Sequence, residues 1–291
     1  MKVNYDSPAD IAGFLKEHHI WLKKRFGQNF LVNPGARKKL ADLLDLSGHE
    51  TVWEVGPGIG SLTAELLPLS RRLKVFEIDR GLSRLLRDLF PAIDLVEGDV
   101  LKTWKKCLEE DGPPDRVIGN LPYSSGAAIL ISFIQGGLSS PKMVFTVQRE
   151  QALRMAALPG SKDYSSFSVV CSSAFRIEQA GDLHPGSFFP RPEVMSRIVV
   201  LTPREDLQIQ RKDVFYLLVR DLFHHKRKTI KNNLEKGVLI TLVDKEALFS
   251  TLEEISLSPK VRPEDLSAHD LARWSEKIGT FLPPAKVSPL L

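Results

Sequence analysis

The chain has 291 residues, of which 43% are hydrophobic and 26% are charged. These values exclude a disordered or fibrous chain, and the length favours one large domain plus a smaller one. The formal net charge of +4 permits nucleic-acid binding without requiring it. Basic residues are concentrated in two runs, Lys23-Lys24-Arg25 and Lys226-Arg227-Lys228, with Lys231 close to the second.

Hydrophobic periodicity in the first half of the chain predicts an alternation of helices and strands. Helices are expected over residues 10–22, 34–46, 61–69, 82–90 and 127–134, and strands over residues 51–55, 73–78, 93–97, 116–119 and 142–148. Strands that alternate with helices of this length form a parallel sheet covered on both faces. The predicted fold class is therefore α/β, with a doubly wound, Rossmann-like sheet.

The pattern becomes purely helical after Pro203, where periodicity predicts helices over residues 214–223, 229–234, 245–252 and 266–278. We expect an N-terminal extension over residues 1–20, an α/β domain over residues 21–203 and a small all-helical domain over residues 204–291. The last residues, 283–291, are expected to form a loose tail. The extension carries no motif that indicates a role.

The two cysteines, Cys107 and Cys171, lie far apart in the sequence and lack Cys-x-x-Cys spacing. They predict neither a disulfide framework nor a zinc site, and they favour a reducing compartment. Residues 1–20 contain charges and no unbroken apolar stretch, and no later segment has the length of a membrane span. We therefore expect a cytoplasmic protein without a metal site or a membrane partner.

A glycine turn, Gly56-Pro57-Gly58-Ile59-Gly60, follows the first predicted strand. In open α/β sheets ligands bind at the carboxyl ends of the strands, although a glycine turn can also be only a tight connection. Glu77 ends the next strand, where a carboxylate can accept hydrogen bonds from ribose hydroxyls. The spacing differs from the G-x-G-x-x-G of dinucleotide sites, and Pro57 removes a backbone donor.

Asp99 follows the third strand, so that it reaches the same edge of the sheet as the glycine turn and Glu77. By itself an aspartate at this position is more typical of a turn or a helix N-cap than of a binding site. A glycine turn and two carboxylates at three consecutive strand ends favour a nucleoside cofactor without phosphates.

The tetrapeptide Asn120-Leu121-Pro122-Tyr123 follows the fourth strand. Asn and Pro also favour plain turns, but these residue types suit the alkylation of an adenine amine, whose lone pair is delocalised into the ring. The amide oxygen of Asn120 and the carbonyl oxygen of Leu121 can accept the two N–H bonds of the amine and aim its lone pair at a methyl donor. Pro122 biases Leu121 toward an extended conformation, and Tyr123 can stack on the target base.

Together these motifs resemble the ribosomal RNA small-subunit adenine dimethyltransferase family, which is related to the erythromycin-resistance methyltransferases. The resemblance extends from Lys24 to the helical tail. It includes the segments Phe26-Gly27-Gln28-Asn29-Phe30-Leu31, Glu54-Val55-Gly56-Pro57-Gly58, Asn120-Leu121-Pro122-Tyr123 and Phe188-Phe189-Pro190-Arg191-Pro192-Glu193-Val194.

The resemblance implies S-adenosylmethionine as cofactor and assigns roles to single residues. The implied cofactor-binding residues are Asn29, Leu31, Gly56, Glu77, Asp99 and Asn120. Asn120, Leu121 and Tyr123 are expected to hold the target adenine, with Phe188 stacking on its other face and Phe189 as the alternate. The implied reaction is the dimethylation of the N6 amines of two adjacent adenines in the terminal hairpin loop of small-subunit rRNA, late in assembly of the small ribosomal subunit.

The second basic run resembles the segment that opens the helical domain of this family. His225 and Lys226 stand where the family usually has Gln and Arg, so positive charge persists but the bidentate geometry of one Arg is lost. A basic run is often only a solvated helix face, but beside a base-modifying site we interpret Lys226, Arg227, Lys228 and Lys231 as RNA-binding residues. His224 and His225 have no acidic or cysteine partners at ligand spacing.

Two other classes of function are compatible with parts of the pattern. Related Asn/Asp-Pro-Pro-Tyr sites occur in DNA adenine and protein glutamine methyltransferases, but Leu121 replaces the first proline. An RNA-binding assembly factor on a degenerate methyltransferase scaffold would have lost residues such as Glu77, Asp99, Asn120 and Tyr123, which are all present. The expected protein is a monomeric enzyme whose partner is the assembling small ribosomal subunit.

Overall fold

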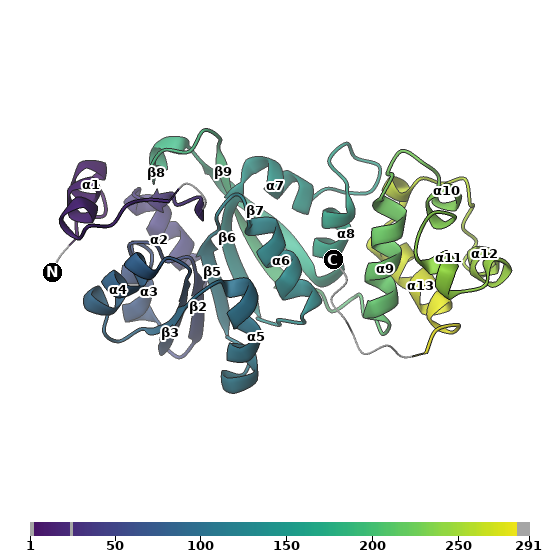
Figure 1. Ribbon diagram of the computed structural model, residues 1–291, viewed down its shortest axis with the longest axis horizontal. Coiled ribbons are helices and arrows are strands. Elements are labelled where there is room, and N and C mark those ends of the chain that lie inside the picture. Colours follow the sequence, from purple (N-terminus) through teal and green to yellow (C-terminus); the bar gives the residue numbers. More distant parts are fainter. Residues whose placement is uncertain (1–2, 24–25, 284–291) are drawn as a thin grey trace. The chain divides into compact units, whose positions relative to one another are not determined.

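The computed structural model describes residues 3–23 and 26–283 (Figure 1). The chain divides into two compact units. The sheet unit comprises the described residues up to 133 together with 137–152 and 177–203, and the helical unit comprises 134–136, 153–176 and the described residues from 204 onward. The helical unit thus includes residues 153–176, which precede the boundary expected at residue 203. Lys24 and Arg25 of the first basic run, and residues 284–291 of the expected tail, lie outside the described residues.

Within the described residues, the sheet unit contains a seven-stranded sheet with the strand order β4-β3-β2-β5-β6-β9-β7. The parallel strands are β2 (Thr51–Val55), β3 (Arg72–Glu77), β4 (Asp94–Glu97), β5 (Arg116–Asn120) and β6 (Lys142–Gln148). The expected doubly wound α/β fold is confirmed. One edge differs from a purely parallel sheet, because β9 (Ser196–Pro203) pairs antiparallel with β6 and separates it from β7 (Phe175–Leu183).

Helices cover both faces of this sheet. The first part of the chain contributes α1 (Pro8–Glu17), α2 (Pro34–Asp42), α3 (Thr63–Leu66), α4 (Arg80–Leu89), α5 (Val100–Asp111), α6 (Gly126–Gln135) and α7 (Arg149–Met155). Leu40 of α2 and Leu66 of α3 pack in one cluster with Val52, Val75 and Ile118 of the central strands. Helices α5 and α6 lie in front of the sheet in Figure 1. The central strand β2 is consequently buried on both faces, although it contains Glu54 among its apolar residues.

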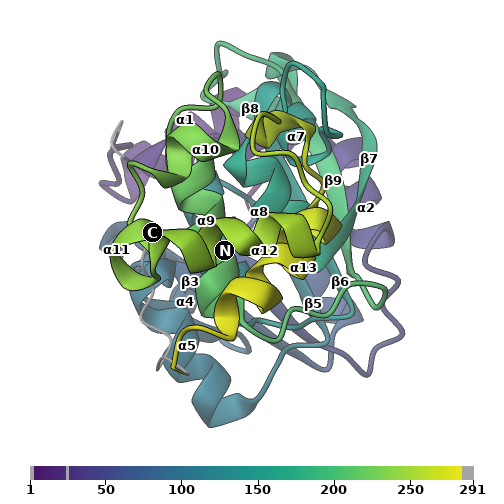
Figure 2. The same ribbon diagram turned by 90° about the vertical axis from the view of Figure 1, so that its right-hand side faces the viewer.

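The helical unit contains α8 (Ser166–Ala174), α9 (Lys212–Phe223), α10 (Ile230–Leu234), α11 (Leu239–Leu242), α12 (Lys245–Glu254) and α13 (Ala268–Gly279) (Figure 2). Its largest buried side chains find polar partners. Trp274 Nε1 donates to Thr251 Oγ1 at 2.8 Å, and the Tyr164 hydroxyl donates to the carbonyl of Leu266 at 2.7 Å. Buried aromatic residues with satisfied polar atoms give this unit a core of its own.

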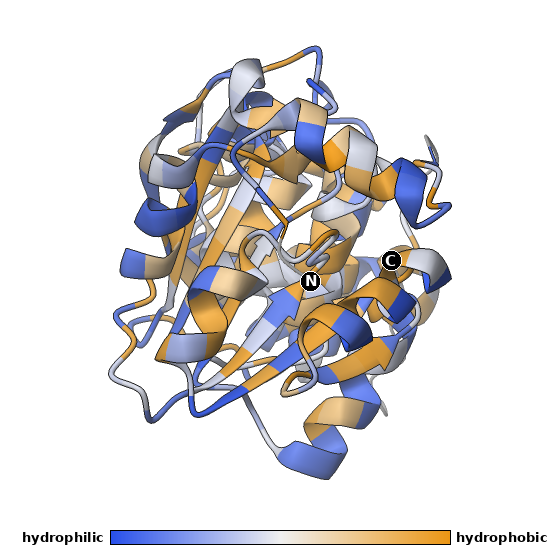
Figure 3. Cartoon of the chain, turned by 90° about the vertical axis from the view of Figure 1, so that its left-hand side faces the viewer, coloured by the Kyte–Doolittle hydropathy of each residue, from blue (hydrophilic) through white to orange (hydrophobic). Residues whose placement is uncertain are grey.

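The distribution of hydropathy follows this architecture. Figure 3 shows hydrophobic residues along the strands and on the inner faces of the helices, and hydrophilic residues on the outer faces. Both cysteines are buried and unpaired. Across residues 3–23 and 26–283, no helix is both long enough and apolar enough to cross a membrane.

Candidate active site

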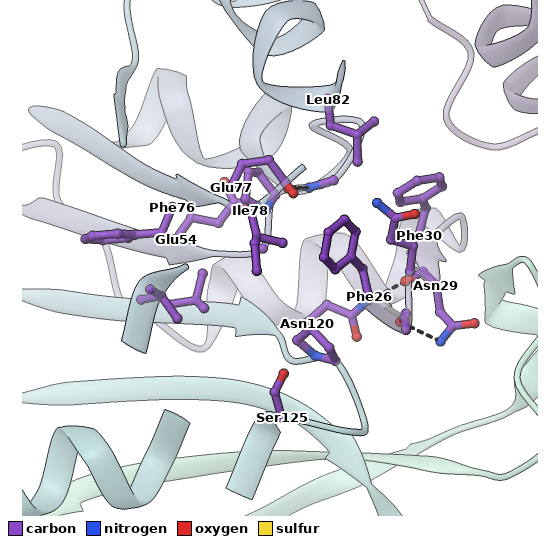
Figure 4. A pocket seen from close by; sticks show the side chains of 18 of the residues that line it. Phe26, Asn29, Phe30, Glu54, Phe76, Glu77, Ile78, Leu82, Asn120 and Ser125 are labelled. Atoms are coloured by element: carbon purple, nitrogen blue, oxygen red, sulfur yellow. Dashed lines mark hydrogen bonds between the residues drawn. The ribbon is translucent and has the colours of Figure 1, made fainter. Parts of the chain in front are cut away.

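A crevice at the carboxyl ends of β2 and β5 lies where the strand order reverses. The two strands are neighbours in the sheet, with Val55 paired to Gly119. From β2 the chain runs outward through β3 and β4 and then returns to β5 on the other side. Such a switch point is where α/β sheets bind ligands. A pocket opens there, and Figure 4 shows the side chains that line it.

All six residues expected around a cofactor line this one pocket. They are Asn29, Leu31, Gly56, Glu77, Asp99 and Asn120. They come from five separate segments of the chain, which the sheet brings to one edge. The structure therefore brings together the set that the family resemblance implied, and their contacts with a cofactor are part of the proposal below.

The glycine turn allows unusually close approach of a neighbouring segment. Gly56 and Gly58 both have positive φ angles, of 71° and 62°, which residues other than glycine rarely adopt. A Cβ atom at Gly58 would lie 2.7 Å from the ring of Phe30. Phe30 belongs to β1 (Phe30–Leu31), so the turn and this short strand form two adjacent walls of the pocket.

Glu77 is a buried carboxylate at the end of β3, with 4% of its surface exposed. Its Oε2 accepts from the Gly58 amide at 3.1 Å, and its Oε1 accepts from the Asp79 amide at 2.8 Å. Burial nevertheless raises the pKa of Glu77 to about 7. Each carboxylate oxygen can accept a further hydrogen bond, so this group is suited to the two hydroxyls of a ribose.

Asp99 combines two roles that the sequence left as alternatives. Its Oδ1 caps α5 by accepting from the Leu101 amide at 3.0 Å. The half-buried residue also lines the pocket. The helix cap therefore fixes the carboxylate at the edge of the pocket, and the second oxygen is suited to accept a bond from an adenine amine.

The side chain of Asn120 is tethered by the loop that precedes β1. Its Nδ2 donates to the backbone carbonyl of Asn29 at 2.5 Å. In the described part of the chain, no donor reaches Asn120 Oδ1 or the carbonyl oxygen of Leu121. The tether sets which way the amide faces and leaves two acceptors next to each other at the end of β5.

Tyr123 is half-buried, and burial raises the pKa of its hydroxyl. This hydroxyl shares a hydrogen bond with Ser196 Oγ, at the start of β9. A ring held at its hydroxyl is restricted in orientation, which suits a stacking surface. Neither Tyr123 nor Leu121 lines the pocket in Figure 4, so the tetrapeptide extends from the pocket to its outer side.

The expectation that Phe188 stacks on the target base is not met by its position. β8 (Phe188–Phe189) pairs antiparallel with β1, and Phe188 lies opposite Leu31. Both residues belong to one buried cluster, but only Leu31 also lines the pocket, and Phe188 is 3% exposed. Side chains alternate along a strand, so Phe189 faces the other way and remains half-buried. Phe189, the alternate from the sequence, is the better candidate.

Comparisons with known proteins identify the family. The model of the family described as ribosomal RNA adenine dimethylase matches residues 21–262. The chain belongs to this family. The proteins called ribosomal RNA small subunit methyltransferase A of Treponema pallidum and Treponema denticola are 42% and 37% identical to it, covering 96% and 95% of this chain and 99% and 96% of theirs. The family expected from the motifs is confirmed.

Solved structures support the same assignment. A dimethyladenosine transferase from Plasmodium falciparum superposes with a TM-score of 0.73 at 25% identity, covering 86% of this dimethylase and 97% of that chain. The 23S rRNA methyltransferase ErmE shares the fold, with a TM-score of 0.61 at 23% identity over 86% of this chain and 99% of its own.

The pocket of this dimethylase also includes residues that sequence reasoning did not single out. Phe26 projects into it beside Ile78 and Asn120 (Figure 4). Ile78 is 41% exposed, which is unusual for an isoleucine and reflects its position at the open pocket. Glu54 is fully buried, and no role was predicted for it from the sequence. Burial raises its pKa to about 8. Phe26 and Glu54 stood within quoted motifs, whereas Ile78 gave no signal beyond its place after Glu77.

The second basic run lies in the turn between α9 and α10 of the helical unit, not on a helix face. Lys226, Arg227, Lys228 and Lys231 are all exposed. Asn233 is buried and holds this turn, because its Nδ2 donates to the carbonyls of His225 at 3.1 Å and of Thr229 at 3.2 Å. Among the described residues, no cluster of three or more His, Cys, Asp or Glu side chains could hold a metal ion.

Proposed function

We propose that this chain is an S-adenosylmethionine-dependent enzyme that dimethylates the N6 amines of two adjacent adenines in the terminal hairpin loop of small-subunit rRNA. The observation that carries the proposal is the tethered amide of Asn120. With Nδ2 bound to Asn29, two acceptors remain for the two N–H bonds of an amine, namely Asn120 Oδ1 and the carbonyl of Leu121. Proteins that match this chain almost end to end carry the name of this methyltransferase.

The residues present fit S-adenosylmethionine at the pocket. The glycine turn at Gly56 and Gly58 leaves room for close approach of a ligand, and the buried Glu77 carboxylate suits ribose hydroxyls. Asp99 would accept a hydrogen bond from the adenine amine of the cofactor, while Asn29 and Leu31 would cover the cofactor from the β1 side. Bound there, the cofactor supplies an electrophilic methyl group on a sulfonium centre.

The chain's own contribution to the chemistry is orientation. An adenine amine donates its lone pair into the ring, so it is a weak nucleophile until its N–H bonds are turned out of the ring plane. Asn120 and Leu121 would accept both N–H bonds and direct the lone pair, and Tyr123 and Phe189 would hold the ring. The nitrogen would gain the methyl group that the sulfonium sulfur gives up, leaving a thioether, and would release one proton to water. In the second round the amine has one N–H bond left, so one of the two acceptors would hold it while a second cofactor molecule supplies the methyl group. No strong general base is required.

Recognition of RNA is assigned to the basic turn of the helical unit. Lys226, Arg227, Lys228 and Lys231 would contact phosphates, which fixes the register of the RNA without reading its bases. A target base in a loop can leave the stack at lower cost than one in a duplex. A monomeric state and a cytoplasmic location are part of the same proposal. A non-catalytic assembly factor is not favoured, because the whole pocket set is present.

Transfer of tritiated methyl groups to small ribosomal subunits from cells that lack this protein tests the proposal. We expect label in small-subunit rRNA and N6,N6-dimethyladenosine at two adjacent positions after nuclease digestion and mass spectrometry. Fully methylated subunits are the matched control and should accept no label. Label that appeared only in large-subunit RNA, DNA or protein would overturn the proposal.

A further inference from the structure

The N-terminal extension, which precedes the part of the chain matched by the family model, packs against the walls of the pocket. Its helix α1 begins after Ser7, whose hydroxyl accepts from the Asp10 amide, and it has a proline in its first turn. One face of α1 is buried, with Ile11 at 0% and Leu15 at 4% exposure. Residues 4–23, which comprise the extension and the first three residues of the matched part, thus belong to the sheet unit.

The buried face of α1 bridges three separate walls of the pocket. Ile11 and Leu15 share one apolar cluster with Phe30 of β1, Ile59 of the glycine turn and Leu82 of α4. Phe30 and Leu82 themselves line the pocket. Phe189 packs against the same cluster, because it lies opposite Phe30 in the β1–β8 pair.

A buried arginine adds a polar connection at the start of the extension. Arg37 of α2 is 5% exposed, and its Nη2 donates to Asp6 Oδ1 at 2.5 Å. Its Nη1 donates to the carbonyl of Val32 at 3.0 Å, and its Nε donates to Glu65 at 3.4 Å. Arg37 therefore connects Asp6 of the extension with Val32, directly after β1, and with Glu65 of α3, the helix that follows the glycine turn.

Lys23, just after the extension, is connected through Asp79 to Glu77, the carboxylate that we propose binds the ribose of the cofactor. Lys23 Nζ donates to Asp79 Oδ2 at 2.8 Å, and the Asp79 amide donates to Glu77 at 2.8 Å. The backbone amide of Lys23 donates to Gln28 Oε1 at 2.9 Å. Both ends and the middle of the extension thus contact residues 26–32 or their immediate partners.

We propose that residues 4–23 form a clasp that holds residues 26–32 against the glycine turn and α4, and so sets the affinity for S-adenosylmethionine. The inference rests on the proposed function, since the ligand is the cofactor of that reaction. Asp6 and Ile11 are positioning residues. They act through Arg37 and Phe30 on the position of residues 26–32.

The first test replaces a single ion-pair partner. Asp6→Asn removes the charge that faces Arg37, and Asp45→Asn is the matched control, because Asp45 is an exposed carboxylate paired with Lys142 elsewhere in the sheet unit. We expect Asp6→Asn to raise the Kd for S-adenosylhomocysteine about fivefold or more, a coupling of ordinary size. The control should stay within twofold of the unaltered protein. At saturating S-adenosylmethionine, kcat should also change by less than twofold.

The second test loosens the apolar contact. Ile11→Ala is compared with Leu248→Ala, which removes the same number of carbons from a fully buried position in α12, another ten-residue helix. Ile11→Ala should raise the Kd for S-adenosylhomocysteine and speed hydrogen exchange of the amides of residues 26–32 in the cofactor-free protein. Leu248→Ala should do neither.

The outcomes separate the clasp from the proposed function. If Asp6→Asn and Ile11→Ala left both the Kd and the exchange of residues 26–32 within twofold of the unaltered protein, the clasp would be overturned. The same conclusion would follow if the control variants weakened binding equally. If the unaltered protein bound no S-adenosylhomocysteine, the proposed function would fail instead, and faster exchange in the two variants would still support the clasp.

Discussion

The side-chain amide of Asn120 is held by the backbone carbonyl of Asn29, a residue 91 positions earlier in the chain. Turning the amide over would place its oxygen against that carbonyl and lose the bond. The contact therefore gives Asn120 one orientation, in which Oδ1 is the atom available to a substrate. It also connects the loop before β1, which lines the pocket, to the residue that we propose faces the target base.

Replacement of Asn120 by alanine tests this assignment. Asn120→Ala removes one of two acceptors for the amine, and we expect kcat/KM to fall by about 100-fold to 1,000-fold, as for other groups that stabilise a transition state. The half-buried side chain contributes little to the core, so the melting temperature should change by only a few degrees. Quantification of N6,N6-dimethyladenosine and thermal unfolding measure the two effects. Full activity in this variant would refute the role.

The strand-end motifs were predictable because periodicity fixes where each strand ends. Glu77 lies at the end of a predicted strand, Asp99 and Asn120 follow two others, and parallel strands place their carboxyl ends at one edge. The tether from Asn29 was not predictable, since nothing local relates two residues so far apart. Phe188 was misplaced for a similar reason. Its direction depends on its register with Leu31, and a one-residue shift in register exchanges the two faces of a strand.

Cofactor affinity should depend on pH through Glu77. Ribose hydroxyls donate to the ionised carboxylate, whereas the free protein has a Glu77 pKa raised to about 7 by burial. Binding must therefore expel a proton below that pH, and affinity should fall by roughly tenfold for each further unit of acidification. Above pH 8 it should be constant. Calorimetric titration with S-adenosylhomocysteine between pH 5.5 and 8.5 gives the profile.

The variant Glu77→Gln assigns this titration. It keeps the shape and one acceptor oxygen but cannot ionise, so binding should be weaker at pH 8 and nearly independent of pH. Glu54 is the other candidate for the titrating group, because burial raises its pKa to about 8 and the charge of Glu77 raises it further. If Glu77→Gln retained the full pH dependence, the titrating group would be a different one.

Phe188 and Phe189 should respond differently to truncation. Phe188→Ala removes a ring from the core and should reduce the free energy of unfolding by about 3–5 kcal/mol. Phe189→Ala removes a half-buried ring that packs against the cluster of Phe30 and Leu82, so it should mainly lower kcat/KM for RNA, by an amount equivalent to about 1–3 kcal/mol of stacking energy. Urea denaturation and steady-state kinetics on both variants compare the effects. Equal kinetic losses in folded Phe188→Ala and Phe189→Ala would contradict the correction.

Charge reversal in the basic turn tests its contact with phosphate. Arg227→Glu should weaken binding to a small-subunit rRNA hairpin and reduce the slope of log K against log salt by about one for each lost contact. Arg273→Glu provides the same change of charge at an exposed position of α13, outside the turn. Filter binding at several salt concentrations should show a smaller slope for Arg227→Glu alone. Identical slopes in the two variants would mean that this basic run is only a solvated surface without phosphate contacts.

The buried amide of Asn233 offers a complementary test, because it holds the turn without carrying charge. Asn233→Ala removes the bonds to His225 and Thr229 but leaves every cation in place. The turn would then have to be ordered by the RNA itself, so affinity should fall while the salt slope stays unchanged. Stability should also decline, by about 1 kcal/mol for each hydrogen bond that is lost. Arg227→Glu should reduce the salt slope, whereas Asn233→Ala should weaken binding at a constant slope, and this difference separates the shape of the turn from its charge. A reduced slope in Asn233→Ala would mean that the substitution had displaced the cations from the phosphates.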